Sequence, residues 1–163
     1  MSILHSLKTG DPGRAKEGDF PVESLYTAGI AGEKFLTALR DRGVLLASRC
    51  EACSVTTLLA RAFCEKCLSP TDSYPEVKGA GEVKTYTLLR RDLDGNPIDP
   101  PEILAFVVFE GVEGGVIHRL DEVAADEVKV GLRVEMVLRK QAEREGSILD
   151  LSHFRPVSTA SGR

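Results

Sequence analysis

The sequence predicts a mainly β protein with an N-terminal helix, in which a rubredoxin-like zinc ribbon precedes a five-stranded OB-fold barrel. Three observations carry this prediction. Apolar side chains recur at helical spacing in residues 31–42, and the only four cysteines form two C-x-x-C pairs within residues 50–67. After them, five short apolar segments alternate with turn residues. The 163 residues, 42% of them hydrophobic, suit one ordinary domain or two small ones.

The N-terminal part combines a polar arm with one amphipathic helix. Residues 1–20 show no sustained periodicity, and we interpret them as a flexible arm or an arm ordered by a partner. Phe20, Leu25 and Tyr26 could belong to a short helix. The helix at residues 31–42 ends on a basic turn followed by Gly43, which is typical of a helix C-terminus.

The cysteines follow a short predicted strand, Val44 to Ser48, and form the strongest motif in the chain. Two C-x-x-C turns supply four thiolates, and the spacer of ten residues is long enough for a hairpin that brings the turns together. The predicted ligands of a structural Zn²⁺ are Cys50, Cys53, Cys64 and Cys67. Because the protein supplies all four ligands, no position remains open for a substrate.

Other roles for these cysteines stay open at the level of sequence. A rubredoxin-type iron site uses similar ligands, and disulfides would require an oxidising compartment. A redox C-x-x-C usually occurs singly near a βαβ pattern, which this chain lacks.

A segment rich in Pro, Gly and Ser, residues 69–82, separates the ribbon from the predicted barrel. The five predicted strands are residues 81–91, 102–112, 114–120, 133–141 and 148–157. Five short strands with turns between them favour a small Greek-key barrel of the OB type. Residues 90–103 are expected to form a long loop that carries contacts, and residues 121–131 a loop or one helical turn. The expected divisions are 1–43 for the arm and helix, 44–78 for the ribbon, 79–157 for the barrel and 158–163 for a tail.

Charge and hydropathy limit the function classes. The net charge is −4, whereas nucleic-acid binders usually carry an excess of basic residues. No run of 18 apolar residues predicts a membrane span, and the start of the chain lacks the apolar core and cleavage site of a secretory signal. We therefore expect a cytoplasmic protein. Binding of single-stranded nucleic acid remains the alternative function, because OB folds and zinc ribbons both serve it.

The order of helix, ribbon and barrel resembles the DUF35 family of acyl-CoA-associated proteins. The resemblance covers residues 31–157 and rests on "KFLTALRDRGVLLASRCEAC", "LLARAFCEKC", "GAGEVKTYTLL", "ILAFVVFEGVEGGVIHRL" and "VGLRVEMVL". Where the family usually has a glycine after each cysteine pair, this chain has Ser54 and Leu68. The family's two prolines before Arg61 are here Leu59 and Ala60.

The resemblance implies a non-catalytic accessory subunit of a thiolase-fold enzyme that acts on β-oxoacyl-CoA thioesters. Two copies of each chain are expected, with the catalytic residues on the partner. The longer arm favours a specialised catabolic partner such as benzoylsuccinyl-CoA thiolase. If CoA is contacted directly, the candidates for its phosphates are Arg49, Arg61, Arg90 and Arg91, with Arg61 at the position of a family arginine.

The partner interface is expected to use apolar residues of the helix and of the second barrel strand. The candidates are Phe35, Leu36, Leu39, Phe106 and Phe109. For the helix, packing in the chain's own core is an equally open interpretation. Catalysis by the chain itself lacks support, because His5, His118 and His153 are not paired with a nucleophile and an acid in a recognisable motif.

Overall fold

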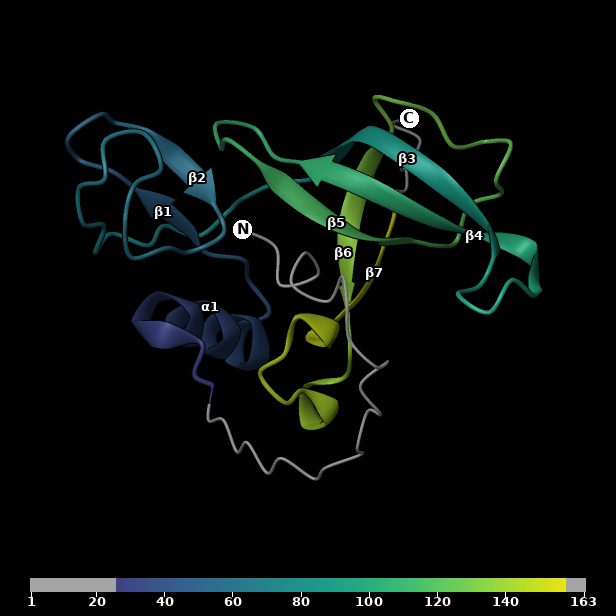
Figure 1. Ribbon diagram of the computed structural model, residues 1–163, viewed down its shortest axis with the longest axis horizontal. Helices are drawn as coiled ribbons and strands as arrows, with labels where there is room; N and C mark the ends of the chain where they lie inside the picture. The colour runs from purple at the N-terminus through teal and green to yellow at the C-terminus, as the bar shows by residue number, and fades with distance from the viewer. Residues whose placement is uncertain (1–25, 158–163) are drawn as a thin grey trace, which may run out of the picture.

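The computed structural model describes residues 26–157 and contains one helix, a small ribbon and a closed barrel (Figure 1). The ribbon lies at one end of the barrel, and the helix lies beside both (Figure 1). The elements are α1 (Gly29–Arg42), β1 (Ala47–Arg49), β2 (Thr56–Leu58), β3 (Gly81–Arg91), β4 (Pro97–Val108), β5 (Gly115–Leu120), β6 (Arg133–Leu138) and β7 (Leu151–Pro156), with single 3-10 turns at Gln141–Glu143 and Ile148–Asp150. The predicted fold class is confirmed. The predictions on the arm, His5 and the tail lie outside the described residues.

Helix α1 packs its apolar face into the chain's own core. It begins two residues before the predicted start, and its C-terminus is closed by Gly43, which has a φ of 68° and donates its N–H to the carbonyl of Leu39 at 3.0 Å. Phe35 is 5% exposed and Leu39 is fully buried, so both belong to the core. Of the two interpretations left open for the helix, the burial of these side chains favours packing in the chain's own core, because periodicity identifies an apolar face but not what covers it. No helix among residues 26–157 has the length and hydropathy needed to cross a bilayer.

The barrel has the strand order of an OB fold. Neighbouring strands follow the order β3-β4-β5-β7-β6, and β6 closes the barrel against β3. Along β4 the inward side chains of Ala105 and Val107 are fully buried, whereas Phe106 between them points outward and is half-buried. Phe109, beyond the strand, is 6% exposed and joins the core, so its burial does not favour the predicted role at a partner interface.

One connecting segment differs from the predictions, and a second takes one of the two forms predicted for it. Residues 90–103 do not form a long loop, because β3 extends to Arg91 and β4 begins at Pro97. The turn between them is closed by the carboxylate of Asp92, which accepts the backbone N–H groups of Asp94 at 2.9 Å and Asn96 at 2.8 Å. The sequence did not predict that the strands extend into this segment, because its three prolines interrupt the alternation of apolar and polar residues. Residues 121–131 form turns without a helix.

Glu113, in the turn between β4 and β5, attaches the ribbon to the barrel. Its backbone exchanges hydrogen bonds with the ribbon, accepting from the N–H of Leu58 at 2.9 Å and donating to the carbonyl of Thr56 at 2.8 Å. Its carboxylate forms an ion pair with Lys66 at 2.7 Å. One residue thus fixes both halves of the ribbon against the start of β5.

We expect Phe154→Ala to lower the free energy of unfolding by about 3–5 kcal/mol, because Phe154 is fully buried at the centre of the barrel. Urea denaturation monitored by circular dichroism measures this change. The matched control is Leu93→Ala in the exposed β3–β4 turn, which should change stability by less than about 0.5 kcal/mol. Equal effects of the two substitutions would contradict the assignment of the core.

Candidate metal centre

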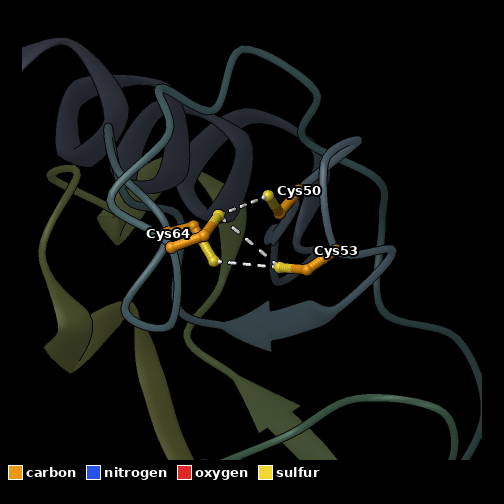
Figure 2. Close-up of side chains that lie close together, drawn as sticks. Cys50, Cys53 and Cys64 are labelled. Carbon is orange, nitrogen blue, oxygen red and sulfur yellow. Dashed lines mark hydrogen bonds between the residues drawn. The ribbon is translucent and has the colours of Figure 1, made fainter.

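The four cysteines converge on one point between two loops. All four sulfurs lie within 4.8 Å of one another, and Figure 2 shows Cys50 and Cys53 directed from one loop toward Cys64 on the other. The Sγ atoms of Cys50 and Cys67, and those of Cys53 and Cys64, are 3.5 Å apart. A tetrahedral site with Zn–S bonds of about 2.3 Å has sulfurs about 3.8 Å apart. The donor set and its spacing therefore fit a tetrahedral metal ion.

The same distances do not fit disulfide bonds. A disulfide needs about 2.05 Å between sulfurs, and all four cysteines are free thiols here. Cys50 and Cys64 are buried, whereas Cys67 is exposed. The centre thus lies near the surface but has two of its four sulfurs in the interior of the ribbon.

Each C-x-x-C pair ends in the same kind of tight turn. The N–H of Cys50 donates to the carbonyl of Val55 at 2.8 Å, and that of Cys64 donates to Ser69 at 2.9 Å. The residue after each pair adopts a left-handed backbone, with a φ of 55° at Ser54 and 59° at Leu68. This conformation is the one that glycine adopts most readily. Ser54 and Leu68 therefore preserve the conformation of the turn, although each replaces the glycine that this conformation favours.

Hydrogen bonds to the sulfurs favour thiolates in the second turn. The hydroxyl and backbone N–H of Ser69 lower the pKa of Cys67 to about 6, and the backbone N–H groups of Cys67 and Lys66 lower the pKa of Cys64. The neighbouring sulfurs of Cys64 and Cys50 raise the pKa of Cys53 to about 12. Four crowded sulfurs cannot all be ionised unless a cation compensates their charge, which is the role that a bound metal would fill.

The side chains of Ser48 and Thr71 bind the backbone of Arg61, which precedes the second C-x-x-C turn, and neither residue was predicted from sequence. The hydroxyl of Ser48 accepts the backbone N–H of Arg61 at 2.5 Å and donates to its carbonyl at 3.1 Å. The hydroxyl of Thr71 donates to the same carbonyl. Both side chains are buried. No spacing in the sequence signals these contacts, because each joins residues ten or more positions apart.

The four arginines proposed for CoA do not form one site. Arg49 and Arg61 lie on the ribbon, where each pairs with an acidic side chain, Glu51 at 3.8 Å and Glu65 respectively. Arg90 and Arg91 lie at the far end of β3 (Figure 1). Because β3 advances roughly 30 Å from its start to this end at about 3.3 Å per residue, one phosphate group cannot contact both pairs. The CoA role of each arginine remains a prediction.

Leu36 and Phe106 are the two interface candidates that stay partly accessible. Leu36 packs against the edge of the core with its side chain half-buried. Phe106 lies on the outer face of β4 opposite Ile117 of β5. These two positions are therefore the ones that still suit contact with a partner.

A hydrogen-bonded Ser–His–Glu set occurs on the barrel, although no sequence motif indicated it. The Oγ of Ser152 lies 3.0 Å from Nδ1 of His153, whose Nε2 lies 3.0 Å from a carboxylate oxygen of Glu122. Arg155 lies 3.7 Å from the same carboxylate. The five main cavities of residues 26–157 do not include Ser152 or His153 in their lining. We therefore interpret this set as a surface network that joins β7 to the end of β5.

His118 is a half-buried residue that packs against the barrel core. Its ring packs edge-on against Phe154 with centroids 6.4 Å apart, and its Nδ1 is buried without a hydrogen-bond partner among the described residues. Burial lowers the pKa of His118, so the ring is neutral near pH 7. It has no neighbouring nucleophile and serves packing.

We expect Leu68→Gly to raise the free energy of unfolding by about 0.5–1 kcal/mol, because glycine removes the left-handed strain at this exposed position. The matched control is Glu51→Gly in the first turn, where φ is not positive and glycine should destabilise by a similar amount. Thermal or urea unfolding of the metal-loaded proteins measures both. A lower stability of Leu68→Gly would contradict the interpretation that the left-handed backbone at this position is strained.

We expect the purified chain to hold one metal ion, and Cys64→Ala to hold none, because three remaining thiolates leave the tetrahedral shell incomplete. Ser69→Ala should keep the ion but bind it about tenfold more weakly, since it removes the hydroxyl that supports Cys67. Elemental analysis and competition with a chelator measure content and affinity. A full equivalent of metal in Cys64→Ala would overturn the assignment.

Two protein families match consecutive parts of the chain. Residues 37–73 match "ChsH2, rubredoxin-like zinc ribbon domain" and residues 74–139 match "ChsH2, C-terminal OB-fold domain". A DUF35 domain-containing scaffold protein of Pyrococcus furiosus is 33% identical over 121 residues, which cover 72% of this chain and 87% of the relative. A protein of the same description from Methanocaldococcus jannaschii is 27% identical over 124 residues, covering 73% and 86%.

Solved structures show the same architecture. A DUF35-family protein of Sulfolobus solfataricus superposes with a TM-score of 0.64 at 25% identity, over 79% of this chain and 87% of that one. A chain of the Ltp2-ChsH2(DUF35) aldolase superposes with a TM-score of 0.57 at 22% identity, over 78% and 95%, a likeness that concerns the fold alone. With a four-cysteine zinc ribbon followed by an OB-fold barrel, the chain belongs to the DUF35 family.

Proposed function

We propose that this chain is a non-catalytic accessory subunit of a thiolase-fold enzyme that acts on β-oxoacyl-CoA thioesters. The observation that carries the proposal is family membership, since the two archaeal relatives are named scaffold proteins. A structural neighbour was solved as part of an aldolase together with Ltp2, which supports an enzyme as the partner. We propose two copies of each chain in a cytoplasmic complex.

The site chemistry supports a structural metal and a partner that supplies catalysis. Four cysteine ligands complete a tetrahedral shell, and this donor set suits Zn²⁺. A closed shell offers no position for a substrate carbonyl or a reactive water. The Ser–His–Glu network lies outside the lining of the five main cavities, which supports a partner as the source of the acyl-transfer residues.

Among the proposed CoA contacts, Arg61 has the most suitable surroundings. It lines a hollow of about 200 Å³ between ribbon and barrel, together with Lys66 and Glu113. Both cations in this hollow are exposed and paired with carboxylates, Arg61 with Glu65 and Lys66 with Glu113. A phosphate of CoA would compete for these cations, and exposed ion pairs cost little to separate. Arg49 is nearest in sequence to this site, whereas Arg90 and Arg91 could contact only a different part of a ligand.

The outer face of β4 and β5 gives little support to the alternative function in single-stranded nucleic-acid binding. OB folds bind oligonucleotides on the face of their second and third strands, which are β4 and β5 here. That face carries Phe106 and Ile117, and its cation Arg119 is paired with Asp121 at 2.5 Å. A phosphate backbone needs unpaired cations along its track, so this face suits an apolar partner better.

Co-expression with thiolase-fold enzymes from the same genome tests the function. We expect one of them to co-purify with the full-length chain in a stoichiometric complex, and thioester cleavage to require both chains. Assays with a panel of β-oxoacyl-CoA thioesters, including benzoylsuccinyl-CoA, would identify the substrate. Arg61→Ala should raise the KM for the thioester about tenfold with kcat retained, since it removes a phosphate contact rather than a reacting group.

A matched control for this measurement is Arg90→Ala at the distant end of β3, which should leave KM unchanged if CoA occupies the ribbon hollow. A zinc-loaded chain that binds no thiolase-fold enzyme, but retains single-stranded nucleic acid in a salt-sensitive way, would replace the proposal by its alternative.

A further inference from the structure

Strand β5 has an open edge over most of its length. All six of its residues pair with β4, from Gly115 opposite Val108 to Leu120 opposite Ile103. On its other side β5 meets β7 at a single pair, Leu120 with Phe154. Within residues 26–157, residues 115–119 form no strand pair on the side that faces away from β4. At about 3.3 Å per residue this edge is roughly 16 Å long, enough for one added strand.

The outward side chains beside this edge are apolar. Ile117 is 70% exposed and lies opposite Phe106, whose neighbours on the same face of β4 are Leu104 and Val108, both half-buried. The ring of Phe106 lies over Gly115, where a Cβ would come within 2.7 Å of it. Because the inward residues of β4 fill the barrel core, β4 is apolar on both faces, which is typical of a strand covered on both sides.

Protection against unwanted pairing is weak at this edge. Exposed edges are usually guarded by lysine, proline or a bulge. Of residues 115–119 only Arg119 is charged at neutral pH, and its guanidinium is occupied by Asp121. No bulge interrupts the pairing of β5 with β4. The edge is therefore suited to accept a strand.

The position of the edge indicates which molecule would occupy it. Gly115 follows directly on Glu113 and Gly114, which line the hollow between ribbon and barrel where Arg61 and Lys66 lie. A chain paired with β5 would therefore continue past this hollow. An enzyme that presents CoA to the hollow would bring its own chain next to this edge, whereas a second copy of this protein would bring no thioester.

We propose that the partner enzyme adds an extended apolar segment to the open edge of β5, with Ile117 and Phe106 contacting alternate side chains of the added strand. This docking surface rests on the proposed function, because it names where the thiolase-fold partner binds. Backbone hydrogen bonds to residues 115–119 supply affinity, and the apolar face selects the segment.

The test uses the full-length chain and the thiolase-fold enzyme that co-purifies with it. Ile117→Asp should weaken the complex at least about 30-fold, as expected for loss of an interface hot spot. Hydrogen exchange of those amides within residues 115–119 that face away from β4, which are alternate residues of the strand, should slow on complex formation in the wild type. The matched control is Leu93→Asp, a fully exposed apolar residue at the far end of the barrel, which should leave the affinity unchanged. Metal content and the unfolding midpoint show that both variants are folded.

Each outcome separates the docking surface from the function. A stable complex with unaltered exchange at residues 115–119 and unweakened by Ile117→Asp would overturn the docking proposal and leave the function standing. Loss of binding in Phe63→Asp alone, at an exposed apolar residue of the ribbon, would move the interface to the ribbon. Dimers of the chain alone that Ile117→Asp dissolves would assign the edge to a second copy. Failure of the wild type to bind any thiolase-fold enzyme would overturn both proposals.

Discussion

The convergence of four sulfurs is the constraint on which the ribbon depends. Strands β1 and β2 have three residues each, and between Cys50 and Cys67 only Leu58 and the two buried cysteines contribute fully buried apolar side chains. So small a core cannot offset the conformational entropy of ordering the two loops. A metal ion held by the four thiolates would supply that free energy instead, since its binding would be coupled to folding of the loops. The backbone geometry of the two turns follows from the need to direct both sulfurs of each pair at one point.

The ribbon is useful to the molecule only because it is rigidly attached. Its connection to the barrel passes through Glu113, which pairs with β2 through the backbone and with Lys66 through its carboxylate. Helix α1 adds a second attachment, because Phe35 and Leu39 share one core with Leu58 of the ribbon and Phe154 of the barrel. A metal bound by the four cysteines would thus order the ribbon, and the shared core fixes its orientation. Both are needed to hold Arg61 at a fixed distance from the start of β5.

Local patterns were sufficient to predict the helix, the cysteine turns and the five barrel strands. They failed where packing between distant residues decides the outcome. The apolar face of α1 was visible in sequence, but periodicity cannot show that the chain's own ribbon and barrel cover Phe35 and Leu39. Arg90 and Arg91 appeared comparable to Arg61, although the length of β3 separates them from the ribbon. The network of Ser152, His153 and Glu122 and the support from Ser48 and Thr71 join residues through the fold, so no short motif could indicate them.

The outer face of the barrel connects this architecture to function. An OB fold used for nucleic acid places cations and stacking rings on its second and third strands, whereas here the corresponding strands carry leucine, valine and isoleucine around one phenylalanine. Closure of the barrel at a single residue pair leaves β5 with free backbone groups next to this apolar face. Side-chain chemistry and backbone hydrogen bonding therefore favour the same occupant, an extended protein segment. Since the ribbon is anchored at the start of β5, a partner bound along that strand would meet the cations of the ribbon without further rearrangement. Under the proposed function, a scaffold of this kind would act by fixing the surfaces between which the reaction of its partner takes place.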